Sequence, residues 1–114
     1  MNERIGLATG YDPAQGVRQF AEAVRQVDER GWDIAFFSET LAPMRDSVTA
    51  LAAFAVATKR ITLGCTQVVR LRSPVTMAQS IASLDELSGG RVVICPGACT
   101  GVHARRYRLD PFDP

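Results

Sequence analysis

The thiols and the single imidazole are the first side chains in this sequence that could do chemistry. Cysteine occurs at Cys65, Cys95 and Cys99, and histidine only at His103. No Cys-x-x-Cys pair is present, so neither a zinc site nor a disulfide scaffold is indicated. A nucleophilic cysteine needs a base close by, and His103 lies on a stretch that the sequence predicts as a loop. We expect reduced, partly buried cysteines and no metal site.

Glu39 is a carboxylate that could do acid–base chemistry, because it comes two residues after the short apolar run that ends at Phe37. In an environment that excludes water, its pKa would shift into a range suited to proton transfer. It could also hydrogen-bond a ligand. The alternative is a loop carboxylate that backbone amides satisfy. Tyr11, which follows another short run, could equally line a substrate pocket or pack.

The basic residues near the carboxyl end form a small patch around His103, made of Arg105, Arg106 and Arg108. Such a patch is typical of a solvated loop. It could also contact a phosphate, but the pattern is not specific.

Alternating strand and helix patterns position these side chains. Apolar runs predict four strands: Arg4–Ala8, Ile34–Phe37, Ile61–Cys65 and Arg91–Cys95. Helical periodicity between them predicts three helices: Asp12–Gly31, Ser47–Thr58 and Ser73–Gly90. Asp12-Pro13 and Ser73-Pro74 each combine an N-cap residue with a proline at the first helical position.

The strand starts recur at intervals of roughly 30 residues, a spacing that predicts a parallel α/β sheet with right-handed crossovers. Two architectures fit, an open doubly wound sheet and part of a (β/α)8 barrel. A dinucleotide-binding sheet would carry Gly-x-Gly-x-x-Gly after its first strand, and Gly6 and Gly10 do not have that spacing. In either architecture the strand ends form a rim where ligands bind. The pattern alone leaves the choice open.

Composition excludes several functions. The chain has 114 residues, 46% of them hydrophobic, and a net charge of +1. Without a run of like charges, neither nucleic acid nor an anionic membrane is an expected partner. No apolar stretch is long enough to span a bilayer and the N-terminus does not read as a signal peptide, so we expect a cytoplasmic protein.

Three segments together resemble the bacterial luciferase-like monooxygenases, a family that includes the F420-dependent reductases related to methylene-tetrahydromethanopterin reductase. They are Asp33–Thr40, Thr58–Pro74 and Ser83–Val93, the last reading Ser-Leu-Asp-Glu-Leu-Ser-Gly-Gly-Arg-Val-Val. The resemblance implies a (β/α)8 TIM barrel, of which this chain would be the N-terminal half, ending before the fourth helix. It also implies an oxidoreductase that uses reduced FMN or coenzyme F420 for hydride transfer or oxygen insertion on a small-molecule substrate.

The resemblance also implies site residues on the strand-end rim. Glu39 would be catalytic, and Tyr11 and Thr40 would line the substrate pocket. Cofactor contacts would come from a backbone bulge after the third strand and from a turn after the fourth. These two sets are Gly64, Cys65, Thr66 and Gln67, and Pro96, Gly97, Ala98 and Thr100.

Two departures from the family pattern limit these assignments. Thr40 stands where the family often has a histidine, so a histidine-based role there is unsupported. The family's glycine-rich end of the fourth strand is here Cys95-Pro96-Gly97-Ala98-Cys99-Thr100, which is closer to the deazaflavin type.

We expect residues 1–114 to form a single partial domain, with 103–114 as a polar tail in which Asp110-Pro111 and Asp113-Pro114 could each start a fourth helix. One hypothesis is a fragment that is inactive alone. The alternative is a half-barrel module that self-associates, or that binds a missing C-terminal half, through its exposed sheet edges.

Overall fold

Four parallel strands alternate with helices in the computed structural model, which describes residues 3–39, 45–68 and 71–109. The order is β1 (Gly6–Thr9), α1 (Val17–Glu29), β2 (Ile34–Ser38), α2 (Ser47–Ala57), β3 (Thr62–Val68), α3 (Pro74–Ser88), β4 (Val92–Gly97) and α4 (Gly101–Arg106). Each strand pairs with the next one in the sequence, in the spatial order β1-β2-β3-β4. This order is that of a barrel, whereas a doubly wound sheet reverses its strand order.

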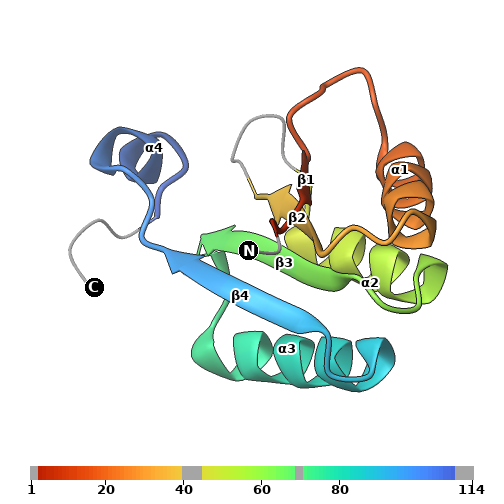
Figure 1. The fold of residues 1–114 in the computed structure, drawn as a ribbon. Helices are drawn as coiled ribbons and strands as arrows, with labels where there is room; N and C mark the ends of the chain where they lie inside the picture. Colours follow the sequence, from red (N-terminus) through yellow and green to blue (C-terminus); the bar gives the residue numbers. More distant parts are fainter. Residues whose placement is uncertain (1–2, 40–44, 69–70, 110–114) are drawn as a thin grey trace.

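The sheet has one face covered by helices and one open face. Figure 1 shows α1, α2 and α3 packed along one side of the sheet, whose strands twist relative to one another. Ala35, Phe37 and Leu63 point to the helices and are fully buried. Because side chains alternate along a strand, their neighbours lie on the other face, which we call the inner face. It carries Gly6, Ala8, Ile34, Phe36, Ser38, Thr62, Gly64, Thr66, Val93, Cys95 and Gly97.

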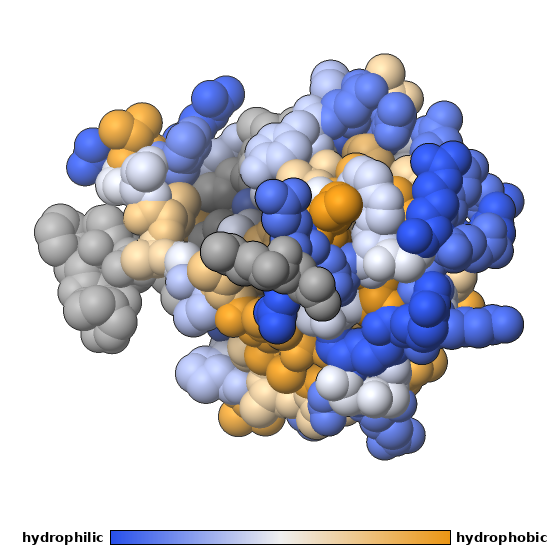
Figure 2. All heavy atoms as spheres, in the orientation of Figure 1, coloured by the Kyte–Doolittle hydropathy of each residue, from blue (hydrophilic) through white to orange (hydrophobic). Residues whose placement is uncertain are grey.

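Apolar packing between the helices and the sheet forms the core. Phe37 of β2 contacts Phe20 of α1 and Phe54 of α2 edge to face, with ring centroids 6.2 Å apart in both pairs. On the inner face, by contrast, Val93 is 48% exposed, and Figure 2 shows apolar atoms at the surface around β4. The described residues therefore bury one face of the sheet and leave the other accessible.

Asp28 joins the end of α1 to the start of β3. Its carboxylate accepts hydrogen bonds from the backbone amides of Lys59, Arg60 and Ile61, at 2.8, 3.1 and 2.8 Å. Burial favours the neutral acid, but the three amide donors outweigh it and lower the pKa of Asp28. Asp28 thus fixes the amino end of β3 against the helix layer.

The predicted strands and helices are confirmed, but α1 starts later than the sequence suggested. Ser73 caps α3 as predicted, accepting a hydrogen bond from the Thr76 amide. At the other predicted cap, Asp12 instead bonds the amide of Ala14, two residues on, and forms a local turn. The helix begins at Val17, where the Gln19 side chain accepts from the Gly16 amide.

The carboxyl ends of β3 and β4 also differ from the prediction. The ladder between them continues through Gln67–Pro96 and Val68–Gly97 without an inserted residue. The predicted bulge at Gly64–Gln67 is therefore absent from the described pairing, and Pro96-Gly97 lies inside β4 instead of in a turn. Residues 101–106, which include His103, form the short helix α4 where a polar tail and loop were expected. The predicted helix starts at Asp110 and Asp113 lie outside the described residues.

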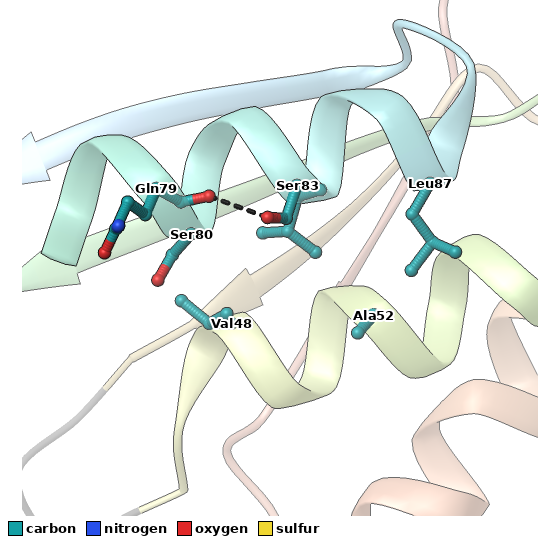
Figure 3. A pocket seen from close by; sticks show the side chains of 7 residues that line it. Val48, Ala52, Gln79, Ser80, Ser83 and Leu87 are labelled. Carbon is teal, nitrogen blue, oxygen red and sulfur yellow. Dashed lines mark hydrogen bonds between the residues drawn. The ribbon is translucent and has the colours of Figure 1, made fainter.

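A shallow groove separates α2 from α3 on the outside of the helix layer (Figure 3). It has a volume of about 300 Å³, and small and apolar side chains line it, among them Ala52, Ser80, Ser83 and Leu87. It lies on the far side of the helices from the inner face. Within the described parts of the chain, no helix is long and apolar enough to cross a membrane.

Candidate functional site

Three hydroxyl groups gather at the carboxyl ends of β1, β2 and β3. Ser38 Oγ donates to Tyr11 Oη at 2.5 Å. Thr66 Oγ1, on the neighbouring strand, accepts from the Glu39 amide at 3.0 Å. Ser38 and Thr66 are register partners and therefore share the inner face. This rim is polar and open, and it lies where parallel barrels hold their ligands.

The Phe36 ring occupies the space that a side chain at Gly64 would need. A Cβ atom at Gly64 would lie 2.3 Å from Cδ2 of the Phe36 ring, which crosses the strand on the inner face. The space above Gly64 is therefore filled by protein. A flat ligand on this face would meet the sheet beyond Phe36, nearer to Thr66 and Gly97.

The side chains of Cys65 and Gln67 point toward the helices and are at most 1% exposed. Burial raises the pKa of the Cys65 thiol to about 11, so it stays protonated at neutral pH. Gln67 Nε2 donates to Ser47 Oγ at 3.3 Å. At Cys65 and Gln67, therefore, only the backbone could face a ligand on the inner face, whereas Thr66 also presents its side chain there.

The predicted residues after β3 and β4 divide between strand and connecting segment. Pro96 and Gly97 pair with Gln67 and Val68, and a Cβ at Gly97 would have only an ordinary contact, at 3.5 Å, with the Gln67 carbonyl. Ala98 and Thr100 are exposed in the segment that leads to α4. Gly97 thus leaves open space at the rim, which is the geometry that a ring-shaped ligand would need.

Glu39 lies in a buried ion-pair cluster and not on the inner face. Its side chain is 2% exposed and that of Arg72 is 12% exposed. Arg72 Nη1 and Nη2 donate to Glu39 Oε1 and Oε2 at 3.0 and 2.7 Å. The Ser47 amide, in the first turn of α2, donates to the same Oε2 at 3.0 Å.

Arg72 also contacts Asp46, the N-cap residue of α2. Its hydrogen bond with Glu39 and its contact with Asp46 raise the pKa of Arg72, although burial opposes them. Arg72 therefore holds together residues on both sides of the segment 40–44 and attaches them to the β3–α3 connection. These contacts indicate a positioning role for Glu39, and its predicted catalytic role stays a prediction.

Sequence reasoning did not assign a role to Arg72. Its partner Glu39 is 33 positions away, and a lone arginine on a connecting segment resembles many surface arginines. The available signal was that both residues follow neighbouring strands of a parallel sheet, whose carboxyl ends meet at one rim. Thr40, predicted to line the substrate pocket, lies outside the described residues.

Tyr11 is 64% exposed and borders a hollow of about 230 Å³ that Asp12, Gln15 and Phe20 also line. This hollow opens between β1 and α1, beside the rim. A second hollow of about 540 Å³, lined by Arg4, Asp33, Ile34, Thr62 and Val93, lies at the opposite, amino end of the strands. Only the first adjoins the predicted site residues.

The cysteines and the histidine do not form a reactive pair or a metal site. All three cysteines are free. His103 Nδ1 lies 2.9 Å from Thr100 Oγ1, and the hydrogen bond of Cys99 Sγ is to the Thr100 carbonyl. Across the ranges 3–39, 45–68 and 71–109, no group of three or more His, Cys, Asp or Glu residues could hold a metal ion.

The sequential order of the four parallel strands and the helices between them define a parallel β/α barrel unit. The sequence matches the luciferase-like monooxygenase family over residues 3–113, and the chain belongs to that family. It is 37% identical over 93 residues to a Mycobacterium tuberculosis protein that is named as a putative coenzyme F420-dependent oxidoreductase. The match covers 80% of this chain and 26% of that relative.

Solved structures give the same assignment of fold. The oxygenating component of 3,6-diketocamphane monooxygenase from Pseudomonas putida, in complex with FMN, has a TM-score of 0.80 at 21% identity. That match covers 91% of this chain and 32% of the monooxygenase. The coenzyme F420-dependent tetrahydromethanopterin reductase of Methanopyrus kandleri has a TM-score of 0.77 at 24% identity, covering 94% of this chain and 30% of the reductase. The chain thus spans about a third or less of these proteins.

Proposed function

We propose that this chain supplies one wall of the cofactor site of an oxidoreductase that acts on a small molecule with reduced flavin or coenzyme F420. The observation that carries the proposal is the open, polar end of the inner face, where Ser38, Thr66 and Gly97 lie beyond the Phe36 ring. Family membership, over nearly the whole chain, supports the same activity. The free cysteines agree with a cytoplasmic location.

The residues at this rim suit a flat, partly polar ring. The absence of a side chain at Gly97 lets a ring approach the backbone of β4 closely. The hydroxyls of Thr66 and Thr100 offer hydrogen bonds to polar ring atoms. When bound, a reduced flavin or deazaflavin would supply a hydride or activate oxygen. The protein groups would bind, orient and shield it.

Glu39 and Arg72 would support this site from the buried side of the rim, without contacting the ligand. Their ion pair joins Glu39, which directly follows β2, to Arg72, which lies just before α3, and the Glu39 amide donates to Thr66 on the inner face. We propose that the pair positions the substrate side of the rim, with Glu39 as a positioning residue. A group whose two oxygens already accept from Arg72 and Ser47 has little capacity left for a reacting molecule.

Coenzyme F420 is the cofactor that we favour over FMN. The mycobacterial relative, the more similar in sequence, is named for F420. The FMN-bound monooxygenase shares the fold at 21% identity, which supports the site but not the choice of cofactor. The end of β4, Cys95-Pro96-Gly97, also resembles the deazaflavin type.

Titration of the 114-residue chain with F420 and with FMN, followed by amide NMR, tests the proposal. We expect shifts at Thr66, Gly97 and Thr100, and no tight binding, because the inner face covers only one side of a ring. Gly97→Val should weaken binding roughly tenfold, since the new side chain occupies the ring position at a cost of about 1.4 kcal/mol.

Thr62→Val is the matched control, because it changes the same face at the opposite end of the strands and should leave binding unchanged. Shifts that map to the groove between α2 and α3, or equal affinities for the chain and its Gly97→Val variant, would contradict the proposal.

A self-associating half-barrel is the second candidate, favoured by the exposure of Val93 on the inner face and of Ile5 before β1, 48% and 51%. Two copies would bury these side chains against each other. Sedimentation of the chain should then give a dimer that Val93→Lys converts to a monomer. A monomer at all concentrations would exclude this candidate.

A further inference from the structure

The basic cluster on α4 places Arg105, Arg106 and Arg108 within four consecutive residues, and none of the three has an acidic partner in the described structure. On α1, Arg25 pairs with both Glu22 and Glu29. Residues 87–109 contain no Asp or Glu, and across the described ranges no ion pair involves Arg105, Arg106 or Arg108. Like charges so close together repel one another, and an anion would relieve that repulsion.

The cluster is connected to the candidate rim by a row of side chains on one side of α4. Thr100, at the N-cap position, contacts His103, and Arg106 lies three residues further along the same side. Arg105 extends back toward the start of the helix, with Nη1 3.7 Å from the position of a Cβ on Gly101. Both arginines therefore belong to the surface of α4, and Figure 1 shows that this helix follows the carboxyl end of β4.

Two backbone conformations hold α4 in this place. Cys99, before the helix, has φ = 69°, and Arg108, after it, has φ = 55°. They are the positive-φ residues other than glycine within the described ranges. Such conformations cost free energy and cluster at binding sites, where the surrounding structure enforces them. The buried Ala104 anchors the opposite side of the helix.

We propose that Arg105 and Arg106, with His103, bind the anionic tail of the cofactor whose ring lies against Thr66 and Gly97. This inference rests on the proposed function, since the ring site defines where the tail starts. Guanidinium groups pair well with phosphate and carboxylate oxygens. FMN ends in one phosphate, whereas F420 continues from a phosphodiester into several carboxylates. A cluster of three arginines and a histidine offers more charge than one phosphate needs, so it favours F420.

Binding of the tail can be distinguished from binding of the ring with four probes and one free anion. The probes are F420, its tail-free deazaflavin, FMN and riboflavin, and the anion is inorganic phosphate. Amide shifts of Gly101 and Ala104 report the tail, and those of Thr66 and Gly97 report the ring. We expect F420 to bind more tightly than the tail-free deazaflavin. The variant Arg105→Gln/Arg106→Gln should weaken F420 binding about tenfold, or about 0.7 kcal/mol for each exposed pair.

The double variant should leave the affinity for riboflavin and for tail-free deazaflavin unchanged. Arg18→Gln/Arg30→Gln is the matched control, because it removes the same charge from exposed positions on and just after α1 and should not change F420 binding. The F420 affinity should fall with added salt in the chain and fall less in the α4 variant.

Four results would overturn the tail site: no shift at Gly101 and Ala104 with F420, equal affinities with and without the tail, equal losses in the two double variants, or shifts with inorganic phosphate as large as with F420. A failure of the proposed ring site would give a different pattern of chemical shifts. In that case Thr66 and Gly97 stay unshifted with every probe, while F420 still shifts the α4 amides in an arginine-dependent way.

Discussion

Breaking the buried pair of Glu39 and Arg72 should cost much of the stability of the chain. In Arg72→Met, the Glu39 carboxylate, 2% exposed, loses two of its hydrogen-bond donors and keeps the Ser47 amide. Leaving a buried charge without its partner costs about 3–5 kcal/mol. Domains of this size are stable by roughly 5–15 kcal/mol, so the loss is a large fraction of the total.

Removing both charges should be less harmful than removing one. In Glu39→Gln/Arg72→Met, the amide oxygen of the introduced glutamine can still accept from the Ser47 amide, and no buried charge is left unpaired. We therefore expect the double variant to be about 2 kcal/mol more stable than the sum of the two single losses predicts. Urea unfolding followed by far-UV circular dichroism measures all four proteins of the cycle.

Two comparison cycles show whether burial is the cause. The contact of Arg72 with Asp46, whose side chain is 46% exposed, should give a coupling below about 1 kcal/mol in a cycle with Asp46→Asn. The surface pair Arg25–Glu29, with side chains 40% and 63% exposed, should behave in the same way. A Glu39–Arg72 coupling below about 0.5 kcal/mol, or one no larger than these two, would refute the reasoning.

Three further predictions concern single residues. Asp28→Asn should destabilise the chain by about 1.5–3 kcal/mol at neutral pH. Because folding lowers the pKa of Asp28, its contribution to stability is complete above the ordinary Asp pKa of about 3.9 and is lost as the pH falls through the lowered value. The free energy of unfolding, measured from pH 6 to 2, should therefore depend less on pH in the variant. Gly64→Ala should cost about 1–3 kcal/mol because its Cβ overlaps the Phe36 ring, and Phe36→Leu in the same chain should recover part of the loss in thermal unfolding. A thiol reagent at pH 8 should modify the exposed Cys95 and spare the buried Cys65, whose pKa is about 11; modification of both at similar rates in the folded chain would count against the described core.

The sequence predicted the strand–helix units well because each unit carries its own local signals. Ser73-Pro74 shows this, since the cap and the proline act within one turn of the helix that they start. Asp12-Pro13 has the same kind of composition and gave the wrong start. There the Asp12 side chain bonds an amide two residues on, and Gly16 with Gln19 caps α1. Two local structures compete for one motif, and the sequence alone does not show which of them the packing of α1 stabilises.

The site was harder to predict because its contacts join distant residues. The apolar pattern of β3 stops at Cys65, yet the strand continues because Gln67 is buried against Ser47 of α2 and its backbone pairs with β4. The side-chain direction of Glu39, toward α2 and Arg72, depends on the β2–α2 connection and has no local signal. Alternation along β3 could have shown in advance that Cys65 and Thr66 face opposite sides of the sheet.

The overlap between Phe36 and the empty position at Gly64 has a consequence for the evolution of the family. The two residues lie on adjacent strands and share one volume on the inner face, so neither can change size independently. Relatives with a larger residue at the position of Gly64 should carry a smaller one at the position of Phe36, and large residues at both positions together should be rare. If an alignment shows glycine at this position in every relative, the aromatic neighbour would explain its conservation, and a contact with the cofactor would not be needed.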